Sequence, residues 1–156
     1  MGQQSIKVVS GGDWMSFDGE LMYIKKVNAS GYDAFPLQWI EFNSFKVTPK
    51  QRLDSSDSKR SLSGYLNRVV LDHEPSKVEF SLNPMKDAEI TAFNTFMNSH
   101  YTVRKKREFV MKYWDVENGN YSEGSFYMPN PQYQIVRRDK NNVIYYDKTR
   151  ISFIEN

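Results

Sequence analysis

The sequence of 156 residues contains no cysteine and only two histidines. Disulfide bonds and thiolate metal sites are therefore excluded. The histidines, His73 and His100, belong to no spaced ligand motif such as HExxH, so we expect each to be an ordinary surface or capping residue. The missing cysteines fit a reducing compartment or an assembly that is held together by its interfaces.

Motifs for nucleotide binding and for nucleophilic catalysis are absent as well. No P-loop, GxGxxG or GxSxG pattern occurs in the sequence. The carboxylates are scattered: Asp54 with Asp57 indicates a polar loop, and Asp87 with Glu89 indicates the start of a helix rather than an acid–base pair. We therefore expect no enzyme, no catalytic residue, no cofactor and no metal site.

The sequence also lacks long apolar runs and a marked excess of one charge. No window approaches the 18 or so apolar residues of a membrane span, and residues 1–9 have no apolar signal core, so we expect no membrane anchor. The 21 basic and 19 acidic residues give a net charge of +2. This balance argues against nucleic acid as a bulk partner.

Aromatic residues, in contrast, are abundant, at 15% of the sequence. Aromatic rings pack well on a pleated surface, so this content favours sheets. We expect one soluble, mainly β domain over residues 1–156, because the length fits an ordinary domain. Trp14, Trp39 and Trp114 each lie in a strand-like run, and we expect them in the core or on a sheet face rather than as platforms for stacked bases.

Hairpin signals separate several of the strand-like runs. Asp18-Gly19 and Asn118-Gly119 are turn dipeptides that tolerate positive φ, and each is predicted to join two antiparallel strands. The runs predicted as strands are 14–17, 21–24, 37–47, 65–71, 78–82, 109–114, 121–127, 133–137 and 143–154.

One amphipathic helix is predicted over about 84–99. Asn83 is the expected N-cap and Pro84 the first helical residue. The residues that recur at helical spacing and form a broad apolar stripe are Ala88, Ile90, Ala92, Phe93, Phe96 and Met97. Phe93 lies in the middle of this stripe, so we expect it to be buried against the sheet.

Residues 49–64 form a long polar segment, rich in serine, between two strand-like runs. Structureless loops of this length are uncommon in compact domains unless they have a function or are disordered. Charges of both signs suit a protein interface better than a nucleic-acid track. We therefore predict an arm that orders on a neighbouring subunit, and the alternative is a solvated loop. The predicted interface residues are Arg52, Leu53, Lys59, Arg60, Leu62 and Arg68.

A second basic stretch, Arg104–Arg107, follows the predicted helix. It either grips phosphate or forms a solvated turn that also neutralises the C-terminal end of the helix. With the nearby Tyr101 and Tyr113 it supports an alternative function, a non-catalytic nucleic-acid-binding β-domain, such as a small barrel.

The order of these elements resembles that of small tail proteins of long-tailed bacteriophages, including tail-tube subunits and the tube-like domain of distal tail proteins. The resemblance extends to small proteins encoded in tail modules of phages and prophages of Gram-positive bacteria. The segments that carry it are 60–71, 77–80, the helix, 124–129 and 151–156. It implies an antiparallel β-sandwich, or a barrel, with one flanking helix and a long polar arm.

The resemblance also implies a function, that of a virion structural protein. Such a protein would form or cap a ring of the tail tube as a tube subunit, a distal tail protein, an adaptor or a completion ring. It would be a homo-oligomer, usually a hexameric ring, that contacts neighbouring tail proteins and lets DNA pass through its lumen. It would be made in the host bacterial cytoplasm and reside in the phage tail. A ring requires that one surface patch meets a different patch on the next copy.

Overall fold

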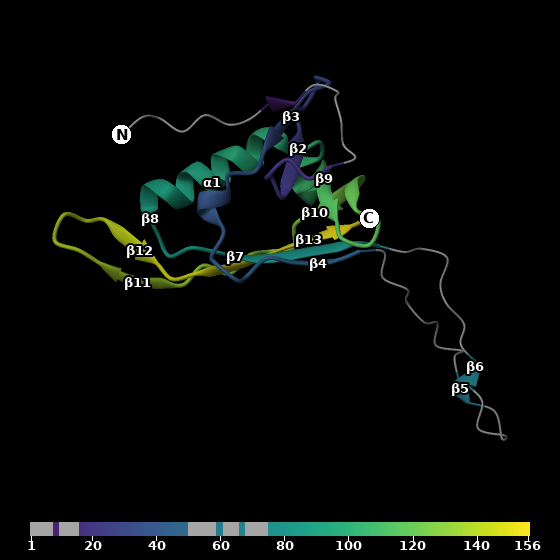
Figure 1. Ribbon diagram of the computed structural model, residues 1–156. Helices are drawn as coiled ribbons and strands as arrows, with labels where there is room; N and C mark the ends of the chain where they lie inside the picture. Colours follow the sequence, from purple (N-terminus) through teal and green to yellow (C-terminus); the bar gives the residue numbers. More distant parts are fainter. Residues whose placement is uncertain (1–7, 10–15, 50–58, 61–65, 68–74) are drawn as a thin grey trace.

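The computed structural model describes residues 8–9, 16–49, 59–60, 66–67 and 75–156 (Figure 1). Strands predominate in this part of the chain. Its one α-helix is α1 (Asp87–His100), and two short 3-10 helices are η1 (Leu37–Trp39) and η2 (Arg104–Lys106). The predicted mainly β, α+β class with a single flanking helix is therefore confirmed.

The largest sheet of the described residues has the strand order β1-β3-β2-β9-β10-β13-β7-β4, and all of its pairs are antiparallel. Its strands are β1 (Val8–Val9), β2 (Met22–Lys25), β3 (Tyr32–Ala34), β4 (Lys46–Thr48), β7 (Lys77–Leu82), β9 (Glu108–Asp115), β10 (Asn120–Tyr127) and β13 (Thr149–Glu155).

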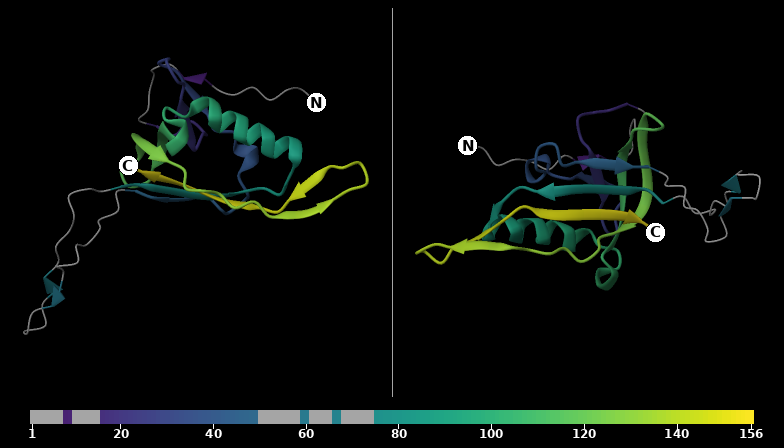
Figure 2. Two further views of the ribbon diagram at one scale, coloured as in Figure 1. Left: turned by 180° about the vertical axis from the view of Figure 1, so that it is seen from behind. Right: turned by 90° about the horizontal axis from the view of Figure 1, so that it is seen from below.

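This sheet is folded into two halves where β10 meets β13. The two strands pair only at Phe126–Tyr127 with Ile154–Glu155, at one end of each strand. Beyond this short contact the halves diverge, and β9 and β10 run across the direction of β13, β7 and β4 (Figure 2). The helix α1 lies along the β7–β13 half and reaches the other half at its C-terminal end, which gives a sandwich-like arrangement (Figure 1).

The main core lies between the helix and the folded sheet. Buried and half-buried residues alternate along β7 and β9, as expected for strands with one face on the core. Phe93 is 0% exposed and packs among buried rings that include Phe35, so the predicted inward face of α1 is confirmed. Ala88 and Ala92 are exposed, and the buried stripe is therefore narrower than predicted.

The two predicted glycine hairpins have different outcomes. Asn118-Gly119 joins β9 to β10, with Gly119 at φ 66°, as predicted. Asp18-Gly19 does not join two strands of the described residues. Instead β2 pairs with β3 across a loop in which Asn28 has φ 60°. The Asp18 carboxylate accepts hydrogen bonds from the hydroxyl groups of Tyr23 and Tyr121.

The run 37–47, predicted as one strand, is mostly not a strand. It begins with η1, touches β7 through the bridge of Ile40 with Leu82, and becomes a strand only at β4. Trp39 and Phe45 pack against the core, whereas Phe42 is 87% exposed in the turn between them. The prediction failed because the apolar residues of this run pack on the core from a turn.

The start of the helix is also later than predicted. Met85–Lys86 form β8, which pairs with β12 (Ile144–Tyr146), and α1 begins at Asp87. Asn83 is therefore not the N-cap, and its side chain donates to the carbonyl oxygens of Gln38 and Ile40. Glu89 caps the helix by accepting a hydrogen bond from the backbone N–H of Lys86 at 3.1 Å.

β8 belongs to a three-stranded sheet with the order β11-β12-β8, in which β11 (Ile135–Arg138) is an edge strand. The predicted strand 143–154 is thus divided into β12 and β13. The hairpin β11–β12 extends beyond the folded sheet at the end opposite to β9 and β10 (Figure 1). A further two-stranded sheet pairs β5 (Lys59–Arg60) with β6 (Leu66–Asn67). Apart from Pro49 and β5, the predicted arm 49–64 lies outside the described residues. The same is true of the run 65–71 apart from β6. Trp14 and Met15, the first two residues of the run 14–17, also lie outside them.

Candidate subunit interface

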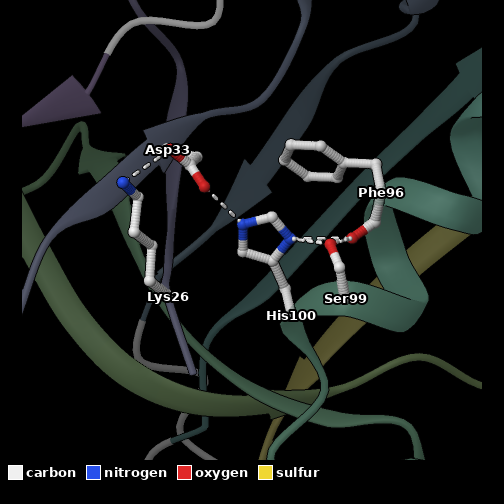
Figure 3. Close-up of polar contacts among 5 residues, drawn as sticks. All are labelled: Lys26, Asp33, Phe96, Ser99 and His100. Carbon is white, nitrogen blue, oxygen red and sulfur yellow. Dashed lines mark hydrogen bonds and ion pairs between the residues drawn. The ribbon is translucent and has the colours of Figure 1, made fainter. Parts of the chain in front are cut away.

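His100 lies at the C-terminal end of α1, where its ring contacts three polar partners (Figure 3). Its Nε2 atom is 2.8 Å from Oδ2 of Asp33 on β3, and its Nδ1 atom is 2.7 Å from the carbonyl oxygen of Phe96. The ring stacks on Phe96, and Lys26 lies 3.8 Å from the other oxygen of Asp33. The network therefore links the C-terminal end of α1 to β3, in the half of the sheet that contains β9 and β10.

Ser99, His100 and Asp33 have the residue types of a catalytic triad but not its hydrogen bonds. In a triad the imidazole accepts the hydroxyl proton of the serine. Here the nitrogen 3.0 Å from Ser99 Oγ also faces the Phe96 carbonyl oxygen, which can only accept. Ser99 itself donates to the same carbonyl oxygen at 2.7 Å. Each histidine was expected to be a surface or capping residue. His100 is buried, so the surface role is wrong for it, and its ring contacts the Phe96 carbonyl in the last turn of α1, as a capping residue would. His73 lies outside the described residues.

Other candidate chemistry in the described ranges is sparse. They contain no group of three or more His, Asp or Glu side chains that could hold a metal ion. No helix in them is long and apolar enough to cross a membrane. Asp87 and Glu89 lie in the first turn of α1, as predicted, whereas Asp54 and Asp57 lie outside the described residues.

The basic stretch after α1 forms an exposed turn. Arg104–Lys106 make up η2, and Arg107 ends it with φ 52°. Tyr101 and Tyr113, which the nucleic-acid alternative needs as stacking platforms, are 8% and 2% exposed. Burial raises the pKa of Tyr101 to about 12. These two rings lack an open face for a base, so this part of the alternative was wrong.

Most of the predicted interface residues are not among the residues that the structure describes. Arg52, Leu53, Leu62 and Arg68 lie outside the described residues, and the structure gives only the backbone of Lys59 and Arg60, in β5. Their role in an interface therefore stays a prediction. The structure adds a different candidate, which lies on the β11–β12 hairpin.

Two consecutive apolar residues on the edge strand of this hairpin are exposed. Ile135 and Val136 are each 59% exposed, and all four residues of β11 are open to solvent. Edge strands with exposed apolar side chains are prone to pair or pack with another chain. In the sequence the two residues belong to the predicted strand 133–137, but their exposure follows from the position of β11 at the edge of the projecting hairpin, which the sequence does not give.

Beside β11 lies a groove of about 340 Å³, which we call the hairpin groove. It is lined by Pro84, Met85, Lys86, Glu89, Val136, Arg137, Tyr145, Tyr146 and Asp147. The guanidinium of Arg137 lies 4.0 Å from the centre of the Tyr145 ring, and the ammonium of Lys86 lies 5.9 Å from it. The groove thus combines apolar walls with two cations at the Tyr145 ring and with the carboxylates of Glu89 and Asp147.

The sequence comparisons bear on this architecture at the level of the family. Residues 15–156 match a family described as a family of unknown function, DUF6711. The chain belongs to this family. The match includes α1, the folded sheet from β2 onward and the β11–β12 hairpin, so DUF6711 comprises the elements that form the hairpin groove. No curated protein matches the sequence.

Proposed function

We propose that this DUF6711 protein is a structural protein of a bacteriophage tail that forms or caps a ring of the tail tube. The role includes a tube subunit, a distal tail protein, an adaptor and a completion ring. The observation that carries the proposal is the projecting β11–β12 hairpin, whose edge strand leaves Ile135 and Val136 in solvent. An assembly would cover these side chains.

The folded sheet supports the proposal in a second way. The hairpin and the β9–β10 end of the sheet lie on opposite sides of the molecule (Figure 1). Contacts through opposite ends are heterologous, and such contacts close into a ring when the rotation between copies allows it. The expected partners are further copies, in a ring that is usually hexameric, and neighbouring tail proteins, with DNA passing through the lumen. The protein would be made in the bacterial cytoplasm and reside in the virion.

Mass measurement in solution tests the proposal. We expect light scattering coupled to gel filtration to give a closed oligomer or stacked rings, and electron microscopy to show particles with a central hole. A protein that stays monomeric up to high concentration contradicts the proposal. A monomer whose migration is shifted by single-stranded DNA would instead support the nucleic-acid alternative.

A further inference from the structure

The turn between β9 and β10, residues 115–120, presents an apolar side chain on a fixed backbone. Asp115 is fully buried, and its carboxylate accepts hydrogen bonds from the backbone N–H groups of Glu117 and Asn118 and from the side chains of Asn118 and Ser122. The Gly119 N–H donates to the Asp115 carbonyl oxygen at 2.9 Å. Val116 is nevertheless 67% exposed at this rigid turn.

A preformed turn loses little conformational entropy when a partner covers it, which favours binding. Glu117, the next residue, is exposed. No cation of the described residues lies within ion-pair distance of its carboxylate. The β9–β10 turn therefore presents an apolar side chain next to an unpaired negative charge.

The hairpin groove has the complementary character. Arg137 has no carboxylate partner within ion-pair distance among the described residues, and Lys86 has none either. The lining also holds the carboxylates of Glu89 and Asp147, which accept from the backbone N–H groups of Lys86 and Lys148, and neither carboxylate lies within ion-pair distance of Arg137 or Lys86. An apolar group flanked by a carboxylate fits the part of this groove at the Tyr145 ring, where both cations lie.

Position decides which copy supplies that ligand. The turn lies at the β9–β10 end of the molecule and the groove lies beside the β11–β12 hairpin at the other end, so the turn does not reach the groove of its own chain (Figures 1 and 2). A second copy offers the same turn to the groove. Since the two patches differ, the contact leaves a free groove and a free turn for the next copies.

We propose that Val116 of one copy inserts into the hairpin groove of the next, with Glu117 facing Arg137 and Lys86. The occupant of the groove is thus a second copy of this chain. This inference rests on the proposed function, because the contact is taken to be the one that joins neighbouring subunits of the ring. Each subunit makes it twice, once with its turn and once with its groove.

Cysteine cross-linking tests the contact directly, because the natural chain has no cysteine. Val116→Cys and a size-tagged Val136→Cys variant are mixed and oxidised with a copper–phenanthroline catalyst. We expect a disulfide-linked heterodimer in the mixture and neither homodimer above the control level. The control is Val103→Cys, which is 41% exposed and belongs to neither surface. A heterodimer yield no higher than that of Val103→Cys mixed with Val136→Cys overturns the inference.

A charge exchange gives an independent test. Glu117→Arg and Arg137→Glu should each weaken association at least ~tenfold, because each places like charges together across the contact. Mixing the two variants should restore association, because both contacts between unlike variants pair opposite charges: a Glu117→Arg turn meets an Arg137→Glu groove, and a natural turn meets a natural groove. The double variant should restore the full oligomer. If wild type and both single variants assemble equally, the proposed ring stands and this contact is wrong. If wild type is monomeric, the proposed ring fails, and cross-linking still reports whether the pair of surfaces meets.

Discussion

Phe35 is the residue around which the core is built. Its ring makes edge contacts with Trp39, Phe80, Phe93, Phe96 and Phe153, at centroid distances of 5.4 to 6.3 Å. These partners come from η1, β7, α1 and β13. One aromatic side chain thus joins the helix to strands that are distant in sequence, which a search for periodic patterns does not reveal.

Phe93 and Phe42 are both apolar residues of predicted elements, but the first is buried and the second is exposed. We expect Phe93→Ala to lower the free energy of unfolding by about 3–5 kcal/mol, because the side chain is fully buried. Phe42→Ala is the matched control, and we expect it to change stability by less than about 0.5 kcal/mol, because Phe42 lies in solvent. Urea unfolding measures both. Equal effects would show that the inward face of α1 is wrongly assigned.

The His100 network should behave as a unit. His100→Ala should cost about 1–3 kcal/mol, because it removes the buried ring and its hydrogen bonds to Asp33 and to the Phe96 carbonyl, which among the described residues keep only Lys26 and Ser99 as side-chain partners. Asp33→Ala should cost less when His100 is already alanine, and the double-mutant cycle should give a coupling energy of about 0.5–3 kcal/mol. Additive effects would mean that the hydrogen bond contributes nothing to stability. Assembly that fails while stability is retained would instead give His100 a role beyond the fold.

At the scale of elements, the ion pairs of Glu79 with Arg150 across the β7–β13 ladder and with Lys77 along β7 make stability depend on pH. Burial by itself would raise the pKa of Glu79, but hydrogen bonds from Arg150 on β13 and from Lys77 hold it below its ordinary value. A carboxyl whose pKa is lowered in the folded state stabilises the fold above its unfolded pKa, and the effect disappears as the pH falls. The difference in melting temperature between wild type and Glu79→Gln should be full above the ordinary carboxyl pKa and should shrink as the pH falls through the lowered pKa of the folded state. A difference that is constant over this range contradicts the assignment.

Local sequence patterns predicted some of these elements well and others poorly. The strand 78–82 and the hairpin at Asn118-Gly119 were predicted correctly because alternation and turn chemistry are local properties. The start of α1 was misplaced because Met85–Lys86 pair with Tyr145–Tyr146, about 60 residues away. The candidate groove was missed for the same reason, since β8, β11 and β12 meet only in the folded chain.

At the scale of the whole molecule, the predicted arm lies in a connection between two neighbouring strands of the large sheet. β4 and β7 are neighbours in the sheet, and their register places Thr48 opposite Lys77. The chain from 49 to 76 is therefore the connection of an antiparallel pair. Such a pair can be closed by a few residues, and loop closure depends only weakly on length.

We therefore expect residues 50–74 to be replaceable by a short Gly/Asn turn without loss of the fold. Ser76 is kept, because it is hydrogen-bonded to Tyr113 and Glu155. The melting temperature should change by a few degrees at most, since shortening a loop this much alters the closure free energy by only about 1–2 kcal/mol. Ring formation should be weakened or lost if the arm orders on a neighbour. A full-length variant with Arg52, Lys59, Arg60 and Arg68 changed to Ser is the matched control, and it tests the side chains separately from the length. Light scattering at equal protein concentration measures both variants. Rings that form unchanged after the replacement would show that residues 50–74 are a solvated connection, and the β11–β12 hairpin would then be the assembly surface that remains.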